Sequence, residues 1–573
     1  MVRRVLIAVL LAGVFAAPAG AYSQSLLPGL VYSKQVLFTP HGPVTVHSLV
    51  APRPGGLFAL HPVLSNLAIS GRERLTAIER TASSSATVAG VNGDFFNAGD
   101  GRPDGIVMQG RVLAALPSPG RSSIGIEPSG SLDIRHADWS AFWQGRGQRR
   151  PLTGLNEPPN DGGISLYTPA WGAATPPDAG ATEAVLYPFP APTPGSDLSG
   201  PVVQFTQGGN TPIPAGGAVL SATGGSAQGL DAEAPPGARV LIRFVLSSGW
   251  ATALDAIGGG PLLVQQGRPV FRAFEDFAPI VLGRRQARTA IGQRSDGSIV
   301  LAAIDGGQAG YSVGMTNYEL AQEMARLGCV TAAALEPGDS TTMAFDGQLL
   351  NRPSDPSGER AISDALLLFY YGVYVAPPSE PVLSPNGDGV GDKESLSYKL
   401  VAPATVTARL VGPDGVARLS QTVHQGPGTY SFTFTGLTAA NQVDLEGRWN
   451  WQVSALDDEG RSSSADQAFW LNNTLGNLHV RPVAVVAARR RVQLATFTLA
   501  HPATVTATVE STNGIVLRKL PQGMLSPGTL GIPWNGRDQR GHLLYAGRYV
   551  LRVETKNQYG SSQLQQTFAL RRG

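Results

Sequence analysis

The sequence has one cysteine, few charged residues and only one sizeable apolar stretch, and each shortage excludes a class of protein. A single Cys in 573 residues excludes a disulfide scaffold. Charged residues make up 15% of the chain, whereas about 25% is typical. The net charge is +2 with no long run of one sign, so nothing indicates a nucleic-acid partner. Beyond the N-terminus, no stretch is long enough to span a membrane.

Glycine and proline are abundant instead. The chain has 70 Gly and 44 Pro, which is 114 of 573 residues or about a fifth, against a usual share of roughly 12%. Glycine has no three-residue period, so collagen is excluded. Because 42% of the residues are hydrophobic, the chain can bury a large core. The composition predicts a sheet-rich, loop-rich protein of several domains.

The N-terminus has the pattern of a secretory signal. Arg3 and Arg4 precede the apolar residues 5–15, and small residues ending in Ala-Gly-Ala follow at 19–21. The apolar stretch is too short to span a bilayer. We expect cleavage near Ala21 and a mature protein that is secreted and has no membrane span.

The C-terminal third contains an internal repeat. LVAPATVTA at 400–408 matches LAHPATVTA at 499–507, and EGRW at 446–449 matches AGRY at 546–549. A spacing of 99 to 100 residues predicts two copies of one domain, at 376–475 and 476–573. Short alternating runs between Gly, Pro, Asn and Asp predict a β-sandwich in each copy. Residues 534–553 of the second copy resemble the immunoglobulin-like domain of flagellar hook-capping proteins.

The first copy opens with SPNGDGVGDK at 384–393, in which oxygen-bearing side chains alternate with glycines. A loop of this kind can wrap Ca²⁺, although the full EF-hand pattern and its terminal Glu are missing. Asn386, Asp388 and Asp392 are the candidate ligands. The alternative is a plain turn at a domain boundary, and we expect no required cofactor elsewhere.

Residues 22–375 contain one legible strand-helix-strand segment. The apolar run 299–304 ends at Asp305, Thr316 and Glu319 form a capping box, and a second apolar run at 330–335 ends at Glu336. This pattern predicts a β-α-β unit in a mixed sheet. The predicted fold is therefore an α+β domain, preceded by the signal at 1–21 and followed by two all-β immunoglobulin-like sandwiches. Asp305 and Glu336 would then share one edge of the sheet.

Several segments of this domain resemble the phosphodiester glycosidase family. In chain order they are VNGDFF (91–96), DGIVMQGRV (104–112), DAIGGGPLLVQQGRPV (255–270), RTAIGQRSDG (288–297), IDGGQAGYSVGMTNYELA (304–321), LEPGDSTTM (335–343) and NRPSDPSGERAISDALLLF (351–369). Seven such motifs in order are specific. The resemblance implies a hydrolase that cleaves the bond between a sugar's anomeric carbon and a phosphodiester.

The residues offer the groups that this chemistry needs. Glycoside hydrolysis generally uses two carboxyl groups, and we predict Asp305 with Glu336 or Asp339. Arginine suits phosphate, which makes Arg288 and Arg360 candidate clamps. The other predicted substrate contacts are Asn92 and Asp94, for the sugar or a metal, and Gly259, Gly260, Ser340 and Thr341, for the anion.

Each of these assignments has a structural alternative. Asn92 and Asp94 suit a turn between strands. Arg288 lies close to other arginines and suits a solvated surface, whereas Arg360 has Glu359 and Asp364 as possible partners.

Residues 334–341 depart from the family pattern, which usually reads Asn-Leu-Asp-Gly-Gly-Gly-Ser-Ser. Here Glu336 stands in place of Asp, Pro337 removes a backbone donor and Asp339 adds a charge. The leading hypothesis is an exported hydrolase of sugar-1-phosphodiesters in an envelope or extracellular phosphoglycan, with the sandwiches attaching it to a polymer or cell surface. The alternatives are a catalytically silent glycan-binding or envelope structural protein and a metal-dependent phosphodiesterase.

Overall fold

The computed structural model describes residues 22–250, 252–270, 274–481, 483–485 and 492–572. The predicted signal at 1–21 lies outside the described residues. The chain divides into two compact units, Met1–Tyr371 and Gly372–Gly573, which we describe separately. Strands dominate both units. In the part of the chain that the structure describes, no helix has the length and apolar character needed to cross a membrane.

The first unit contains an eight-stranded sheet that carries the predicted strand-helix-strand segment. Every neighbouring pair in it is antiparallel, so the prediction of a mixed sheet is wrong here. Its order is β1 (Tyr22–Leu27), β2 (Leu30–Thr39), β3 (Gly42–Ala51), β22 (Ile299–Ile304), β21 (Arg288–Arg294), β23 (Cys329–Ala334), β19 (Leu262–Gln265) and β20 (Arg268–Pro269).

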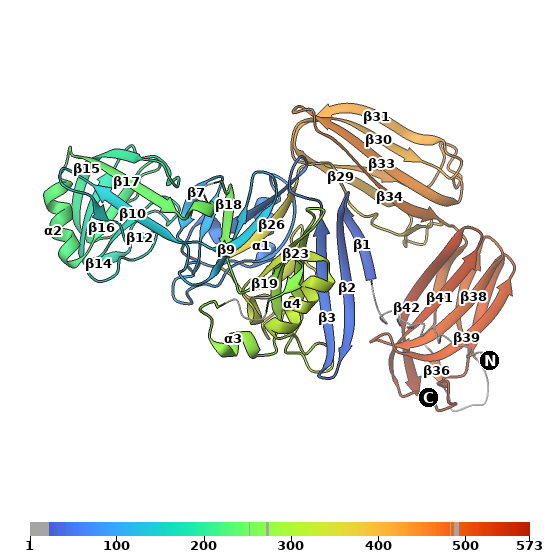
Figure 1. Ribbon diagram of the computed structural model, residues 1–573. Coiled ribbons are helices and arrows are strands. Elements are labelled where there is room, and N and C mark those ends of the chain that lie inside the picture. The colour runs from blue at the N-terminus through green and yellow to red at the C-terminus, as the bar shows by residue number, and fades with distance from the viewer. Residues whose placement is uncertain (1–21, 251, 271–273, 482, 486–491, 573) are drawn as a thin grey trace, which may run out of the picture. The chain divides into compact units, whose positions relative to one another are not determined.

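Strand β21 lies between β22 and β23 and is antiparallel to both. Strands β22 and β23 therefore run in the same direction without pairing with each other. Helix α4 (Asn317–Arg326) connects them, and its Thr316 cap and the capping box with Glu319 are confirmed. Helix α4 packs against β19, β21 and β23 (Figure 1). Its Leu320 and Met324 are buried in the core that it shares with these strands.

A second sheet of five strands holds two buried central strands side by side. Its order is β25 (Gln348–Leu349), β24 (Met343–Phe345), β5 (Thr87–Asn92), β26 (Asp364–Tyr370) and β4 (Phe58–Leu64). Every residue of β5 and β26 is buried. Because the two strands are antiparallel, with Asn92 opposite Ala365, the end of β5 lies beside the start of β26. Helix α1 (Leu75–Ala82) packs against this sheet.

A third sheet brings two glycine-rich turns together. Its order is β7 (Val112–Ala115), β6 (Val107–Gln109), β18 (Asp255–Gly258), β8 (Ser122–Ile126) and β9 (Leu132–His136). Strand β18 pairs with both β6 and β8. The start of β6, the end of β18 and the start of β8 consequently share one region of the unit.

Between β9 and β18 the chain builds another sheet, whose hydrophobic core includes Trp143 and Phe244 and continues into Met108 and Leu113 of the third sheet. This segment was not predicted as a separate part of residues 22–375. Its order is β11 (Arg150–Pro151), β10 (Trp139–Gln144), β17 (Arg239–Leu246), β15 (Leu198–Gly209), β14 (Pro177–Leu186), β16 (Ala218–Ala222), β13 (Ile164–Tyr167) and β12 (Gly154–Leu155), with helix α2 (Gly224–Glu233) packed against it.

The second unit contains the same pair of sheets twice, as the internal repeat predicts (Figure 1). The first copy pairs β27 (Tyr374–Val375), β29 (Glu394–Leu400) and β32 (Gly428–Phe434), and separately β28 (Val382–Leu383), β34 (Ser462–Leu471), β33 (Gly447–Asp457), β30 (Ala404–Val411) and β31 (Ala417–Gln425). The second copy pairs β35 (Leu475–Val480), β37 (Val492–Leu499) and β40 (Gly528–Trp534), and separately β36 (Val483–Val485), β42 (Gly560–Arg572), β41 (Gly547–Asn557), β38 (Ala503–Ser511) and β39 (Val516–Leu525). Buried Trp449 and Trp451 lie in the first core and Trp534 in the second.

Candidate functional site

Three carboxyl groups meet where β5 ends and β26 begins. Asp94 follows β5, Asp364 is the first residue of β26, and Glu336 follows β23. The Asp94 N–H donates to Oδ1 of Asp364 over 2.8 Å, and the Glu336 N–H donates to the Gly93 carbonyl over 3.1 Å. Backbone hydrogen bonds therefore hold the three residues around one turn. We call Asp94, Glu336 and Asp364 the carboxyl cluster.

Glycines make room for this cluster. A Cβ added to Gly258 would lie 2.0 Å from Oδ2 of Asp94, and one on Gly105 would lie 2.5 Å from the same atom. A Cβ on Gly93 would lie 2.0 Å from Oδ1 of Asp364. Real side chains do not approach so closely. The glycines at these turns are thus required by the close approach of the carboxyl groups.

We expect Gly258→Ala to destabilise the first unit. The new methyl group would meet both Asp94 and the Gly105 backbone, 2.8 Å away, and overpacking of this kind costs about 1–3 kcal/mol. Urea unfolding measures the change. Gly225→Ala is the control, because its added Cβ meets nothing within 4 Å and alanine favours helix α2. Equal stability of the two variants would contradict the packing argument.

Burial raises the pKa of every member of the carboxyl cluster. The pKa of Asp94 rises to about 7 because the side chain is buried, with a further contribution from Asp104. Burial also raises the pKa of Glu336 to about 7, with Asp94 adding to the shift and Arg360 opposing it. The pKa of Asp364 is raised well above its usual range by burial and by Asp94. The cluster therefore retains protons near neutral pH.

Several oxygens of the cluster lack a partner. Both carboxyl oxygens of Asp94, Oδ2 of Asp364 and Oε2 of Glu336 are buried without a hydrogen bond from the described residues. Buried polar atoms are nearly always satisfied, and exceptions concentrate at functional sites. These four oxygens make the cluster a candidate for binding and protonating a ligand.

We expect the cluster to make stability fall as pH rises. A carboxyl group whose folded pKa lies near 7 binds more protons folded than unfolded between pH 4 and 7, so the free energy of unfolding decreases across that window. Asp364→Asn keeps the acceptor for the Asp94 N–H and removes one titratable group from the cluster. Urea unfolding at pH 5 and pH 8 should give a smaller difference for this variant than for the wild type.

Asp355→Asn is the control for this pH measurement. Hydrogen bonds from Ser357 lower the pKa of the half-buried Asp355, so it is ionised in both states above pH 5 and contributes no slope. If Asp364→Asn leaves the difference in unfolding free energy between pH 5 and pH 8 unchanged, the pH dependence does not come from the carboxyl cluster.

Arg360 connects the cluster to the turn at 338–340. Its Nη1 donates to Oγ of Ser340 over 3.0 Å and lies 3.7 Å from Oε1 of Glu336. The guanidinium lies 5.0 Å from the centroid of the Phe96 ring. The side chain is 34% exposed, so the guanidinium retains donors that a phosphate can reach. The structure thus brings together three predicted residues, Glu336, Ser340 and Arg360.

A second arginine flanks the cluster. Arg121 lies over the Phe95 and Phe277 rings at 5.0 and 4.8 Å. Its Nη1 is 3.6 Å from Oδ2 of Asp104. The positive charge of Arg121 opposes the upward shift of the Asp94 pKa. Arg121 is consequently a further cation for an anionic ligand.

Asp305 lies in a different network from Glu336. Its Oδ2 receives a hydrogen bond from the Tyr311 hydroxyl and contacts Nε2 of His47, both at 2.9 Å. Its Oδ1 accepts from Nδ2 of Asn351 at 3.0 Å and from the Arg352 N–H at 3.1 Å. The carboxylate is fully buried with all four contacts made within the protein. We interpret Asp305 as a positioning residue that ties β3, β22 and the 351–352 loop together.

Two other predicted residues have hydrogen-bond partners outside the cluster. Arg288 is buried and donates to the carbonyls of Met315 at 2.9 Å and Arg284 at 2.6 Å, and burial lowers its pKa to about 10. Its position corrects the solvated-surface alternative, because β21 is covered on both faces. Asp339 is exposed and accepts a hydrogen bond from Ser354 over 3.0 Å.

Asn92 acts within the fold. Its Nδ2 donates to the Glu336 carbonyl over 2.9 Å, and its Oδ1 accepts from the Thr289 hydroxyl over 2.7 Å. The Thr342 N–H is a third partner, at 3.2 Å. Asn92 is fully buried and holds the turn after β23 against β5. This role resembles the alternative prediction, in which Asn92 stabilises a turn between strands.

Some of the backbone N–H groups that were predicted to bind the anion already donate hydrogen bonds within the protein. The Gly260 N–H donates to the Ala334 carbonyl over 2.9 Å, and the Thr341 N–H donates to the Gly338 carbonyl over 3.0 Å. A Cβ on Gly259 would lie 2.9 Å from the Ala334 carbonyl oxygen, which explains a glycine there by packing. The buried Oγ1 of Thr341 lacks a hydrogen-bond partner from the described residues.

The predicted calcium loop joins the two sandwiches. Asp392 accepts two backbone N–H groups of its own loop, at 2.8 and 2.7 Å. Asp388 accepts from the Asn477 N–H over 2.9 Å, and Asn386 donates to the Leu475 carbonyl over 3.1 Å. No group of three or more His, Cys, Asp or Glu side chains suited to a metal occurs among the described residues. Calcium binding here stays a prediction.

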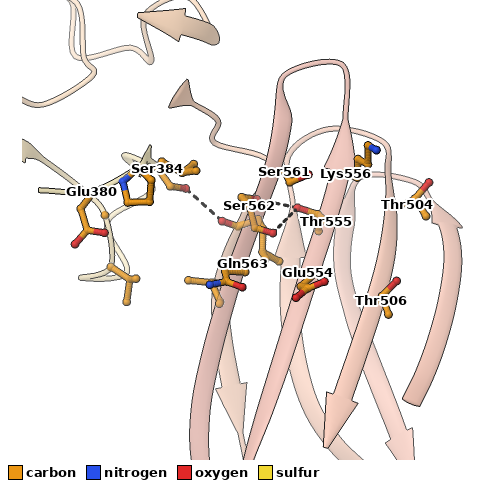
Figure 2. Close-up of a pocket in the computed structure, with 16 residues that line it drawn as sticks. Glu380, Ser384, Thr504, Thr506, Glu554, Thr555, Lys556, Ser561, Ser562 and Gln563 are labelled. Atoms are coloured by element: carbon orange, nitrogen blue, oxygen red, sulfur yellow. Dashed lines mark hydrogen bonds between the residues drawn. The ribbon is translucent and has the colours of Figure 1, made fainter. Parts of the chain in front are cut away.

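A cavity of about 630 Å³ lies in the second unit, between residues 380–391 and strands β38, β41 and β42. Figure 2 shows its polar lining. The hydroxyls of Thr555 and Ser562 bond to each other over 2.8 Å, and Ser384 donates to the Leu475 carbonyl over 3.3 Å. These buried groups are satisfied within the protein, in contrast to the carboxyl cluster. We therefore place the candidate site in the first unit.

Three residues of the site were not among those predicted from the sequence: Asp364, Asp104 and Arg121. Asp364 directly precedes an apolar run of seven residues, and Asp104 opens one of the quoted motifs. Position at a strand end was therefore a usable signal for Asp364. Arg121 carries no such signal, because only the pairing of β8 with β18 brings it to the site.

Comparison with known proteins supports both resemblances. Residues 197–369 match the sequence model of the phosphodiester glycosidase family, and residues 490–558 match the FlgD Ig-like domain. The first match includes Glu336, Arg360 and Asp364, whereas Asp94 lies before it.

The individual relatives cover parts of the chain. The SPbeta prophage-derived uncharacterized protein YomE of Bacillus subtilis is 34% identical over 118 residues, which is 21% of this chain and 18% of YomE. A hypothetical protein from Synechocystis superposes with a TM-score of 0.52 at 26% identity, over 62% of this chain and 64% of that one. The chain thus spans less than two thirds of both relatives.

The catalytic domain of zebrafish N-acetylglucosamine-1-phosphodiester alpha-N-acetylglucosaminidase is a more distant neighbour. It has a TM-score of 0.32 and 15% identity, over 61% of this chain and 87% of that domain.

Proposed function

We propose that the first unit hydrolyses the bond between a sugar's anomeric carbon and a phosphodiester. The carboxyl cluster carries this proposal, because it combines buried unpartnered oxygens, pKa values near 7 and two flanking arginines. The match of residues 197–369 to the phosphodiester glycosidase family supports the same reaction class.

The residues divide the chemistry between them. Arg360 binds the phosphate and neutralises the charge that develops on it as the glycosidic bond breaks. Glu336, whose pKa of about 7 keeps both protonation states populated, acts as the acid/base group. Asp94 and Asp364 share protons, and their remaining negative charge stabilises the positive charge that develops at the anomeric carbon. A phosphate leaves readily, so strong protonation of the leaving oxygen is not required.

The chain would act outside the cytoplasm on a phosphoglycan of the cell envelope or surroundings, with the second unit attaching it to a polymer or surface. The N-terminal signal pattern and the FlgD Ig-like match support this part of the proposal.

Release of free sugar from a panel of sugar-1-phosphodiesters tests the activity. The wild type should release sugar from at least one member, and Glu336→Gln should not do so at a comparable rate. No release from any member, or equal release by both proteins, would overturn the proposal.

The altered turn at 337–340 keeps a second function open, that of a silent glycan-binding protein. Pro337 has no N–H to offer, and the Gly338 N–H already donates to the Ala287 carbonyl over 2.9 Å. Binding of the phosphodiester panel without turnover would favour this function.

A further inference from the structure

An apolar cavity of about 550 Å³ lies in the first unit beside the carboxyl cluster. It is formed by β19, the short helix α3 (Pro279–Gly283) and the first turn of α4. Leu262, Val270, Phe277 and Leu282 supply apolar walls. Sites for small organic ligands have volumes of about 300–1,000 Å³ and mostly apolar linings with a few polar groups.

The cavity and the carboxyl cluster share a wall. The Phe277 ring lines the cavity, and its centroid lies 5.3 Å from that of Phe95, the residue after Asp94. Arg121 lies over both rings. A Cβ on Gly260 would lie 3.0 Å from the Phe277 ring. A ligand whose phosphate is near Arg121 can therefore extend into the cavity.

One buried polar atom in the lining lacks a partner. Oδ1 of Asn317, at the start of α4, is buried without a hydrogen bond from the described residues, and the side chain is only 7% exposed. Such an acceptor costs free energy unless something donates to it. A hydrocarbon has no hydrogen-bond donor, so this oxygen does not by itself recognise an apolar ligand.

Apolar side chains are also exposed at the cavity. Phe274 is 89% exposed and Tyr318 is 49% exposed, and both line it. Their exposure leaves apolar surface that a ligand can withdraw from water.

We propose that this cavity binds the alcohol half of the phosphodiester substrate and that this half is apolar, such as an alkyl or isoprenoid chain. This inference rests on the proposed function. The sugar then lies at the carboxyl cluster, the phosphate lies between Arg360 and Arg121, and the chain enters between Phe277 and Leu282.

Methyl, butyl and hexyl esters of one sugar 1-phosphate test the proposal with the full-length protein. Each methylene that enters the cavity should raise kcat/KM by up to about fourfold, so the hexyl ester should exceed the methyl ester by at least about tenfold. Leu282→Asn should reduce this ratio. Ile280→Asn is the matched control, because Ile280 lies on the same helix, is 68% exposed and is outside the cavity lining.

Equal kcat/KM values for the three esters would overturn the apolar specificity while leaving the proposed function intact. If no ester is hydrolysed, the proposed function fails, and calorimetry with hexyl phosphate and methyl phosphate decides the inference separately. Tighter binding of hexyl phosphate that Leu282→Asn weakens and Ile280→Asn retains supports the cavity assignment. Equal binding of the two phosphates overturns it.

Discussion

Replacing Glu336 with Gln is expected to lower kcat/KM for a sugar-1-phosphodiester by about 10²–10⁴, the range for loss of a positioned acid/base group. Gln preserves the shape of the side chain but cannot exchange a proton. The pKa of Glu336 is raised to about 7 by burial, so the wild-type rate should also change with pH near neutrality. That change should be smaller in the Glu336→Gln profile, because Asp94, whose pKa is also raised to about 7, still titrates in the cluster. Initial rates of sugar release between pH 5 and 9 measure both effects.

Asp339→Asn is the matched control in the same turn. Asp339 is exposed and accepts a hydrogen bond from Ser354, so its replacement should change kcat/KM by less than about threefold, in keeping with a surface position. A large loss for Asp339→Asn together with a small loss for Glu336→Gln would transfer the acid/base role to Asp339.

Arg360→Met is expected to lower kcat/KM by about 10²–10³, as removal of a donor to developing negative charge does elsewhere. Methionine retains contact with Phe96 but offers no N–H to a phosphate. The loss should appear mainly in kcat, because the leaving phosphate gains charge in the transition state. Steady-state kinetics on the substrate found in the panel measure it.

Arg72→Met tests whether the effect comes from the ring contact alone. Arg72 also lies over Phe96, at 5.8 Å, and is exposed. It should therefore change kcat/KM only slightly. Equal losses for Arg72→Met and Arg360→Met would contradict a specific role for Arg360 with the phosphate.

Several local features were predictable because they depend on neighbouring residues. The capping box of Thr316 and Glu319 and the amphipathic spacing of Leu320 and Met324 define helix α4. Likewise, the hundred-residue spacing of LVAPATVTA and LAHPATVTA predicts two copies of one sandwich, and the structure contains both. Local hydrogen bonding and periodicity suffice for such predictions.

The position of Asp305 relative to Glu336 was not predictable in the same way. Both follow strands that run in the same direction, but β21 lies between those strands. Asp305 consequently contacts His47 and Asn351, whereas Glu336 contacts Arg360. Strand order depends on which segments pair across the sheet, and no local pattern states it.

The amino-acid sequence by itself determined the repeated sandwiches, helix α4, the family resemblance and the importance of Glu336, Asp94 and Arg360 as candidates. Only the tertiary structure decided that Asp364 joins Asp94 and Glu336 and that Asp305 contacts His47 and Asn351 instead. The physical reason is that a pKa near 7 arises from burial and from charges that other strands bring close. Burial and proximity of this kind exist only after β5, β23 and β26 have packed together.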